Sequence, residues 1–320
     1  MAWRARRPHA LRLENLGNTC YANAVLNAVA KLASCRAWLA NHQRRRLGEA
    51  GHDAECLLCA LAEDVARLTT LHCNEPFAPS VVQKRARWDA ARTFDNRQQH
   101  DANEALGALL GACDALDLAA FRALAVGGGV RADGAVAYTS PHWKMFGALT
   151  KQTTRCSRCP RIVEQYAMLN TLPVAVPLHG RPTVEALITE TLGNEPLDDP
   201  DDRCPCGATG ARTKTTTMVR KPEIFVLHLK RWAFDAARCR HNKVHTPVSF
   251  ETLLTLDVGA SYDLRSVVVH HGEAGSGHYT AFVRAQSNFW YHTDDDEPPE
   301  QCSTDQVLAA EAYMLFYERR

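Results

Sequence analysis

The pattern of hydrophobic residues changes partway along this chain. Up to about residue 125, Ala, Leu and Val recur every three or four positions, in the stretches 22–39, 56–71 and 101–124. This spacing places them on one face of an α-helix, so the first part of the chain is predicted to be a helical lobe. A glycine-rich segment, 127–134, interrupts the pattern and is predicted to be a flexible connection.

The rest of the chain is predicted to be rich in strands. Short runs of Val, Ile, Thr and aromatic residues, bounded by Pro, Gly or charged residues, occur at 172–178, 215–219, 224–229, 266–270 and 279–284. β-Branched and aromatic residues between such turn signals favour strands. The acidic run 198–202 is predicted to be an exposed loop. The fold class expected is therefore α+β, with a helical N-terminal lobe followed by a strand-rich remainder.

Length and charge narrow the class of protein. The 320 residues, 46% of them hydrophobic, can bury the core of one large domain or two ordinary ones. The 37 basic and 36 acidic residues nearly cancel, which gives no electrostatic support for nucleic acid as a partner. No run approaches the roughly 20 apolar residues that span a bilayer, and the Arg-rich N-terminus lacks the apolar run of a secretory signal. We expect a cytoplasmic or nuclear protein that binds neither nucleic acid nor membrane.

Cys20 is the first candidate for chemistry, because it stands where a helical pattern begins. Unpaired backbone N–H groups and the positive end of the helix dipole favour a thiolate there. They predict a pKa in the range of roughly 3.5–7.5. The same N–H groups can hold an oxyanion, and Asn15 could add a side-chain donor. The alternative is a buried cysteine without a function.

His278 is the candidate base, because it follows Gly277 and opens a predicted strand. Histidine titrates near neutrality, which suits a general base for a cysteine. Such a base needs a third group to hold its tautomer and orientation. The three consecutive aspartates at 294–296 offer that group.

Three segments resemble the sequence boxes of the ubiquitin-specific proteases, a family of papain-like cysteine deubiquitinases. They are 15–24 (NLGNTCYANA, cysteine box), 98–106 (QQHDANEAL, glutamine–aspartate box) and 269–282 (VHHGEAGSGHYTAF, histidine box). Shorter similarities follow in the family's order at 145–147, 225–232 and 312–317. The resemblance covers about residues 13–317, and the chain is identified as a member of this family.

The resemblance implies a papain-like fold with fingers, palm and thumb in a single catalytic domain over 13–317. The thumb would span about 13–125 and the fingers about 140–218, with the palm formed by the remainder. Residues 1–12 would be a short N-terminal extension.

The resemblance also implies an activity, which is hydrolysis of the isopeptide or peptide bond after the C-terminal glycine of ubiquitin. Cys20 would be the nucleophile and His278 the base, Asp294 would orient His278, and Asn15 and Asp295 would serve the oxyanion region. The partners would be ubiquitin and ubiquitinated proteins, and the enzyme a monomer. Two alternatives stay open: an inactive ubiquitin-binding scaffold, and a protease for another ubiquitin-like modifier.

A second group of residues is predicted to bind the substrate. Asp101 and Glu104 are spaced to share one helix face, and paired carboxylates bind arginines. By the resemblance they meet the basic tail of ubiquitin, and His270 lines the channel for that tail. Gly277 and Tyr279, on either side of the base, are further candidates. The alternative for the two acids is a favourable position at a helix N-terminus.

Four cysteines predict a structural zinc ion. Cys156 and Cys159 form a C-x-x-C pair, and Cys204 and Cys206 form a C-x-C pair. Two pairs joined by a long insert are a common plan for a tetrahedral Zn²⁺ site. By the resemblance this site lies at the tip of the fingers. In the family the second pair is usually C-x-x-C, so a degenerate site held by packing is the alternative. No cofactor is expected for catalysis.

The other cysteines receive simpler interpretations. Cys56 and Cys59 lie near His52, His72 and Cys73 in the sequence, which suggests a second metal site. However, both belong to a helical pattern, where cysteine is an ordinary core residue, so core packing is predicted. Four cysteines receive no function, namely Cys35, Cys113, Cys239 and Cys302.

Overall fold

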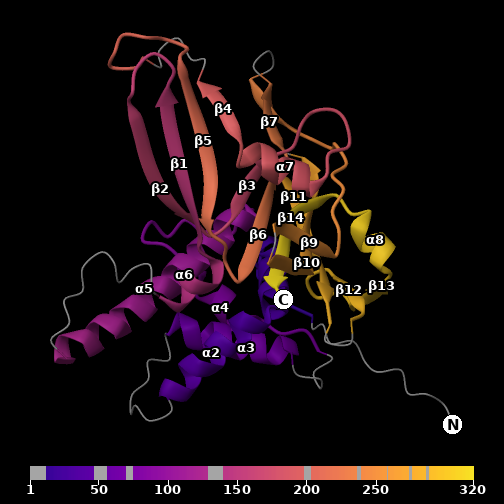
Figure 1. Cartoon of the computed structure of the whole chain (residues 1–320). Helices are drawn as coiled ribbons and strands as arrows, with labels where there is room; N and C mark the ends of the chain where they lie inside the picture. Colours follow the sequence, from indigo (N-terminus) through magenta and orange to yellow (C-terminus); the bar gives the residue numbers. More distant parts are fainter. Residues whose placement is uncertain are drawn as a thin grey trace.

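A computed structural model describes residues 12–46, 56–69, 75–128, 140–197, 203–235, 239–257, 259–273, 276–285 and 288–320. The first half forms a helical lobe, drawn in indigo to magenta in Figure 1. Its helices are α1 (Cys20–Ala30), α2 (Ala33–Arg46), α3 (Leu57–Thr69), α4 (Ser80–Gln83), the 3-10 turn η1 (Arg85–Arg87), α5 (Ala102–Gly128) and α6 (Pro141–Phe146). None of the helices in the described ranges is long and apolar enough to cross a membrane.

Helix α1 is the centre of the molecule, and every one of its residues is buried. Its sequence is apolar on all sides apart from Tyr21 and two asparagines, which is the pattern of a helix enclosed by protein. It packs against α2, α3 and α5 on one side and against β10 (Ala260–Glu273) and β11 (Ser276–Arg284) on the other. The Ser266 hydroxyl on β10 donates to the Ala28 carbonyl at 3.3 Å. The residue at the start of α1 is therefore held between lobe and sheet.

The second half is built on an eight-stranded sheet, which we call the palm. Its strand order is β13-β12-β11-β10-β14-β6-β3, with β9 also paired to β10. All pairs are antiparallel except β3 with β6. The remaining strands of this sheet are β3 (Leu172–Ala175), β6 (Ile224–Lys230), β9 (Leu253–Asp257), β12 (Trp290–Thr293), β13 (Glu300–Cys302) and β14 (Ala312–Arg319).

A separate four-stranded sheet, which we call the fingers, rises from the palm at the upper left of Figure 1. Its order is β2-β1-β5-β4, formed by β1 (Ala148–Cys156), β2 (Ile162–Leu169), β4 (Asn194–Leu197) and β5 (Arg212–Arg220). The hairpin of β7 (Trp232–Asp235) and β8 (Arg240–Lys243) continues from β6. Two short helices, α7 (Val184–Thr191) and α8 (Thr304–Leu308), complete the described elements.

The α+β class and the change from helices to strands are confirmed. The stretch 22–39 is not one helix, since α1 ends at Ala30 and α2 begins at Ala33. The helix does not end where the glycine-rich segment 127–134 begins, because α5 continues through Gly128. The rest of that segment and the acidic run 198–202 lie outside the described residues. Helices α7 and α8 were not anticipated within the strand-rich half.

A buried arginine ties the β7–β8 hairpin to the palm. Arg231 is only 1% exposed. Its Nε donates to the Ala312 carbonyl at 2.7 Å, and its Nη1 donates to Val244 at 2.9 Å and Thr246 at 3.0 Å. Burying a guanidinium is costly unless its donors are satisfied, and here three carbonyls do so.

We expect Arg231→Met to lower the free energy of unfolding by roughly 3 kcal/mol, because three buried carbonyls lose their donors. Chemical denaturation followed by tryptophan fluorescence measures this. The control is Arg92→Met, whose exposed ion pair with Asp95 should change stability by less than ~0.5 kcal/mol. Equal stabilities for the two variants would contradict the role of Arg231.

Candidate active site

The loop before Cys20 is shaped by one asparagine. Asn15 Oδ1 accepts hydrogen bonds from the backbone N–H groups of Gly17 and Thr19, both at 3.0 Å. Gly17 adopts φ +95°, a conformation that glycine reaches without strain. The Thr19 hydroxyl in turn accepts from the Leu16 N–H at 2.9 Å. This folded loop delivers Cys20 to the first position of α1, where its side chain is buried.

The environment of Cys20 raises its pKa in the free protein. Burial has the largest effect and Asp295 adds to it, while backbone N–H groups, first that of Tyr279, act in the opposite direction. The prediction that the helix N-terminus by itself yields a low pKa is therefore wrong. When protein encloses the start of a helix, the loss of solvation raises the pKa of a thiol there by more than the helix dipole lowers it. Cys20 then needs a base to remove its proton.

His278, on β11, is paired with an aspartate. Its Nε2 lies 2.5 Å from Oδ1 of Asp294, the residue that follows β12. Because β11 and β12 are neighbours in the palm, residues 16 positions apart meet here. The contact occupies Nε2 and leaves Nδ1 for another partner. In the described part of the chain, no hydrogen bond joins His278 to Cys20.

Asp295 connects the nucleophile segment to the palm. Its carboxylate accepts from Asn15 Nδ2 at 2.7 Å and from Asn23 Nδ2 at 2.8 Å. Its backbone carbonyl accepts from the Leu13 N–H at 2.8 Å. Burial raises the pKa of Asp295, while the two asparagine bonds act against this. The Asn15 amide thus donates one hydrogen bond to Asp295, and the segment before α1 is tied to the palm.

Asn23 has no role in the sequence interpretation, although it belongs to the segment 15–24. The available signal was its position three residues after Cys20, on the same face of a helix that is otherwise apolar. Its amide also donates to the Glu14 carbonyl at 3.1 Å. The structure thus brings Cys20, Asn15, Asn23 and Asp295 into one assembly.

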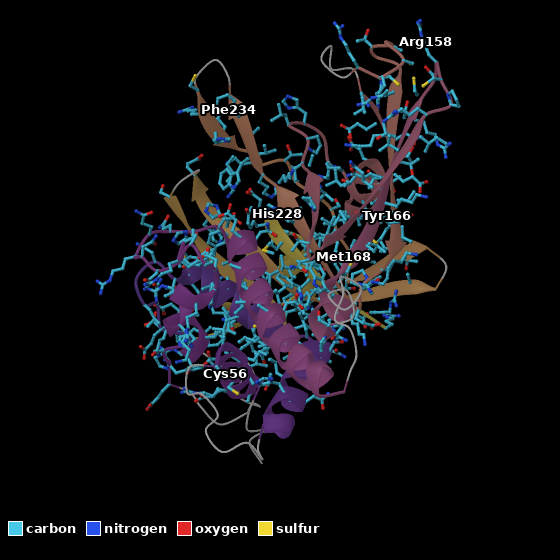
Figure 2. All side chains as sticks on the ribbon, turned by 90° about the vertical axis from the view of Figure 1, so that its left-hand side faces the viewer. Cys56, Arg158, Tyr166, Met168, His228 and Phe234 are labelled. Atoms are coloured by element: carbon cyan, nitrogen blue, oxygen red, sulfur yellow. The ribbon has the colours of Figure 1, made fainter. Side chains whose placement is uncertain are left out.

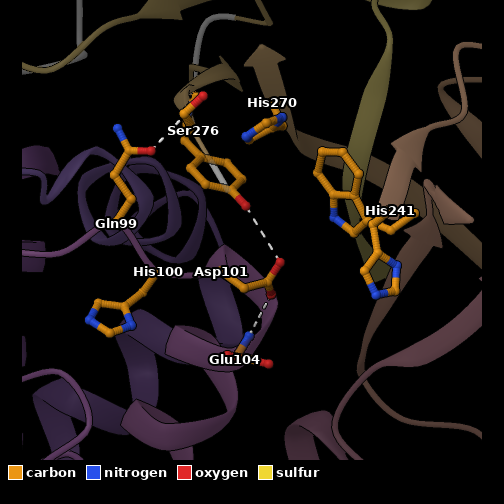
Figure 3. Close-up of a pocket in the computed structure, with 10 residues that line it drawn as sticks. Gln99, His100, Asp101, Glu104, His241, His270 and Ser276 are labelled. Carbon is orange, nitrogen blue, oxygen red and sulfur yellow. Dashed lines mark hydrogen bonds between the residues drawn. The ribbon is translucent and has the colours of Figure 1, made fainter. Parts of the chain in front are cut away.

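A cavity of about 410 Å³ is lined in part by Tyr279, whose backbone N–H faces Cys20. Figure 3 shows the residues that line it. We call it the tail pocket. All five residues predicted to bind substrate line it, namely Asp101, Glu104, His270, Gly277 and Tyr279. The sequence interpretation missed five further lining residues: Gln99, His100, Trp232, His241 and Ser276. Gln99 and His100 belong to the segment 98–106, Trp232 to 225–232 and Ser276 to 269–282, so motif context was the available signal for all but His241.

The acidic side of the tail pocket is the start of α5. Asp101 Oδ1 accepts from the backbone N–H groups of Asn103 at 2.8 Å and Glu104 at 2.9 Å, which caps the helix. Its Oδ2 accepts from the Tyr313 hydroxyl and, at 3.4 Å, from that of Tyr279. Asp101 therefore caps the helix and also lines the pocket, so the two alternatives given for it do not exclude each other. Partial burial and the neighbouring Asp101 raise the pKa of Glu104.

The opposite side of the tail pocket is aromatic. The His270 ring lies 4.7 Å from that of Tyr279 and 5.3 Å from that of Trp232, both edge-on. Burial lowers the pKa of His270 to about 4, so its ring is neutral at physiological pH. A Cβ at Gly277 would lie 2.2 Å from His270 Nε2, so only glycine fits there. The Gly277 N–H donates to Gln99 Oε1 at 2.8 Å and links the two sides (Figure 3).

Four cysteine sulfurs meet at the tip of the fingers, where Figure 2 labels Arg158. Cys156 Sγ lies 3.9 Å from Cys206 Sγ, and Cys159 Sγ lies 3.7 Å from Cys204 Sγ. All four sulfurs are within 4.8 Å of one another. The Arg158 N–H, 3.4 Å from Cys156 Sγ, lowers the pKa of that thiol to about 7.

The C-x-C pair does not prevent this convergence. Its chain makes a tight turn in which the Gly207 N–H donates to the Cys204 carbonyl at 2.8 Å. Gly207 has φ +87°, which a residue with a side chain rarely adopts. The turn points both sulfurs toward the first pair. The set therefore has the donors and spacing that a tetrahedral metal ion requires.

A smaller cluster lies in the helical lobe. Cys56 and Cys59 are half-buried, and Cys56 packs against the hydrophobic core as predicted. The Cys56 Sγ also lies 3.6 Å from His42 Nε2. These groups offer three ligand atoms, and the described ranges bring no fourth His, Cys or acid into the group. His52, His72 and Cys73 lie outside those ranges.

Four cysteines have no predicted function. Cys35 and Cys113 are fully buried, Cys302 is half-buried and Cys239 is exposed.

Comparisons with known proteins agree on one family. Residues 11–317 match the family model described as ubiquitin carboxyl-terminal hydrolase. Ubiquitin carboxyl-terminal hydrolase 15 of Arabidopsis thaliana is 30% identical over 96% of this chain, which spans only 33% of that relative. Probable ubiquitin carboxyl-terminal hydrolase 16 of Schizosaccharomyces pombe is 27% identical over 100% of this chain and 69% of its own length.

A solved structure supports the fold. The SAGA Ubp8/Sgf11/Sus1/Sgf73 DUB module bound to ubiquitin aldehyde aligns with a TM-score of 0.79. The alignment covers 99% of this chain and 71% of the compared chain, at 18% identity. At this identity the similarity concerns the fold, and it supports the papain-like arrangement of thumb, palm and fingers.

The raised pKa of Cys20 predicts its reactivity. In the free protein, the rate of Cys20 alkylation by iodoacetamide should rise about tenfold per pH unit and not level off below pH ~8.5, because only the thiolate reacts. Peptide mass spectrometry across a pH series measures this. The urea-unfolded chain is the control and should level off earlier. A plateau of the folded protein below pH ~7 would show a thiolate already formed.

Proposed function

This chain belongs to the ubiquitin carboxyl-terminal hydrolase family, and from this premise we propose that it is a thiol-dependent deubiquitinase. It hydrolyses the isopeptide or peptide bond after the C-terminal glycine of ubiquitin. The observation that carries the proposal is the arrangement along β11. His278, paired with Asp294, is flanked by Gly277 and Tyr279 of the tail pocket, and the Tyr279 N–H faces Cys20.

The proposed reaction begins with proton transfer from Cys20 Sγ to His278 Nδ1. The thiolate attacks the carbonyl carbon of the terminal glycine, and the negative charge moves to the carbonyl oxygen. That oxygen is held by the unused Asn15 N–H and by backbone N–H groups at the start of α1. The C–N bond then breaks, and His278 returns the proton to the leaving amine. Water hydrolyses the thioester, releasing the carboxylic acid and restoring the thiol.

Asp294 has an orienting role in this scheme. Its bond to Nε2 selects the tautomer that presents Nδ1 to the thiol and stabilises the imidazolium when it forms. Asp295 acts differently, because it holds Asn15 rather than His278. Asp294 and Asp295 therefore have distinct roles, although the two residues are adjacent in the sequence.

The tail pocket is proposed to bind the C-terminal tail of ubiquitin. Asp101 and Glu104 attract its basic side chains, while neutral His270 and the aromatic rings enclose its backbone. The Gly277 N–H, which now donates to Gln99, can donate instead to a substrate carbonyl. Glycine at 277 keeps this wall low enough for a narrow peptide.

A structural Zn²⁺ is proposed for the fingers, held by Cys156, Cys159, Cys204 and Cys206. Sulfurs at about 2.3 Å from a tetrahedral zinc lie about 3.8 Å apart, and the 3.7 and 3.9 Å separations here fit. When bound, the ion cross-links β1 to the segment before β5. The alternative of a packed but metal-free cluster predicts the same fold without the ion.

We further propose that the protein is a monomer in the cytoplasm or nucleus. None of the eleven cysteines in the described part of the chain forms a disulfide, as is usual in a reducing compartment. The formal net charge of +1 supports the absence of nucleic-acid binding. Two rival functions remain: a ubiquitin-binding scaffold without catalysis, and a protease for another ubiquitin-like modifier.

We expect ubiquitin carrying a thiol-reactive C-terminal electrophile to form a covalent adduct with the protein, seen as a gel shift and by mass spectrometry. Cys20→Ala should abolish the adduct, because the nucleophile is absent. Cys239→Ala, which removes an exposed thiol, should form it normally. Binding of ubiquitin without an adduct would favour the scaffold. An adduct only with the probe of another modifier would favour the second rival.

The zinc proposal predicts that the zinc content of the protein depends on the four cysteines at the tip of the fingers. Protein purified under reducing conditions should contain zinc by mass spectrometry, and Cys159→Ser should lose one equivalent and melt at a lower temperature. Cys302→Ser, outside the cluster, should keep the full content. Zinc-free wild-type protein, or an unchanged content in Cys159→Ser, would contradict the proposal.

A further inference from the structure

A buried lysine lies behind the aromatic wall of the tail pocket. Lys243 ends β8, and its side chain is only 4% exposed. Its Nζ donates to the backbone carbonyl of His270 at 2.6 Å and lies 3.1 Å from Glu311 Oε1. An ammonium group this deep is costly unless paired, and the carbonyl and carboxylate supply its partners.

Glu311 makes this contact a junction of three chain segments. It directly precedes β14, so the pair links β8, β10 and the start of β14. Its other oxygen, Oε2, lies 3.0 Å from His245 Nδ1. Burial raises the pKa of Glu311, but the bonds from His245 and Lys243 outweigh it, so the pKa is lowered. Glu311 is therefore a carboxylate at neutral pH and completes the charge pair.

The junction sits directly behind two residues that line the pocket. Trp232 is the strand partner of Lys243 across the β7–β8 hairpin, and His270 supplies the carbonyl. Figure 3 shows His270 and His241 across the pocket from Gln99 and His100. Among the described residues that line the pocket, Lys243 and Glu311 do not appear. They can reach a substrate only through the wall that they support.

The junction also affects the charge in the pocket. After burial, the Lys243 charge is the largest cause of the low pKa of His270, which is about 4. A neutral His270 adds no positive charge to the wall that faces Asp101 and Glu104. A protonated His270 would repel the basic side chains that the two acids attract.

We propose that Lys243 and Glu311 are positioning residues for substrate binding: Lys243 anchors the His270 carbonyl, Glu311 anchors Lys243, and together they hold the pocket wall that faces Asp101 and Glu104. The proposal rests on the proposed function in that the occupant is the tail of ubiquitin. It goes further because it assigns part of the affinity for the substrate to two residues that do not touch the substrate.

The kinetic test compares hydrolysis of a fluorogenic ubiquitin C-terminal amide by the wild type, Lys243→Met, Glu311→Gln and the double variant. Lys243→Met should raise KM about tenfold, the effect of one lost charge-assisted hydrogen bond, and leave kcat within about twofold. Glu311→Gln should raise KM about threefold. The double variant should match Lys243→Met, because Glu311 acts through Lys243.

Glu223→Gln is the matched control. Its carboxylate pairs with Arg319 at 3.8 Å at the other end of β14, away from the pocket. It should leave both constants unchanged. An unchanged KM in Lys243→Met, or equal KM values for Glu311→Gln and Glu223→Gln, would overturn the proposal. If Lys243→Met does not fold, the comparison of the two glutamate variants decides.

A spectroscopic test is independent of activity. The His270 ring resonances, assigned by their loss in His270→Gln, are titrated by NMR in the wild type and in Lys243→Met. Removing the ammonium should raise the pKa of His270, and an unchanged pKa would overturn the proposal. A wild type that does not cleave ubiquitin would refute the proposed function instead, and the titration would then decide this proposal alone.

Discussion

The carboxylate of Asp295 is the contact on which the site depends. It lies just beyond β12 in the palm, yet its two oxygens are bound by Asn15 before α1 and Asn23 within it. The lobe and the palm are thereby joined at the residue next to the partner of His278. A buried carboxylate without donors would be costly, so the two asparagines make the junction specific. Helix α1, enclosed on all sides, transmits this constraint to Cys20.

Burial at this junction has a chemical consequence. Enclosing the start of α1 places the nucleophile accurately, but it also removes solvent from the thiol and raises its pKa. Reactivity then depends on His278, whose ring is held by Asp294 on a neighbouring strand. The separation of these tasks explains why two adjacent aspartates differ. Asp294 is partly exposed and serves the base, whereas Asp295 is buried and serves the loop of the nucleophile.

The walls of the tail pocket are likewise held in place by contacts that lie outside the pocket or at its edge. Its acidic side is held by the helix cap of α5 and by tyrosine hydroxyls, and its aromatic side by strand pairing and the Lys243–Glu311 pair. Arg231, which is buried, links the start of β14 to the segment after β8, because it donates to the Ala312 carbonyl and to those of Val244 and Thr246. Charged groups that never face the pocket therefore position the neutral groups that do.

The sequence by itself determined the division into a helical and a strand-rich half and the residue types of the site. A period of three to four residues marked the helical half, and runs of β-branched and aromatic residues between turn signals marked the strand-rich half. Motifs containing Cys20, His278 and the acids at 101 and 104 predicted the chemistry. The tertiary structure decided which atoms meet: Lys243 with His270, Asn23 with Asp295, and the C-x-C sulfurs with Cys156 and Cys159. It also reversed the expected pKa shift of Cys20, since solvation depends on what packs over a residue and local sequence does not encode that.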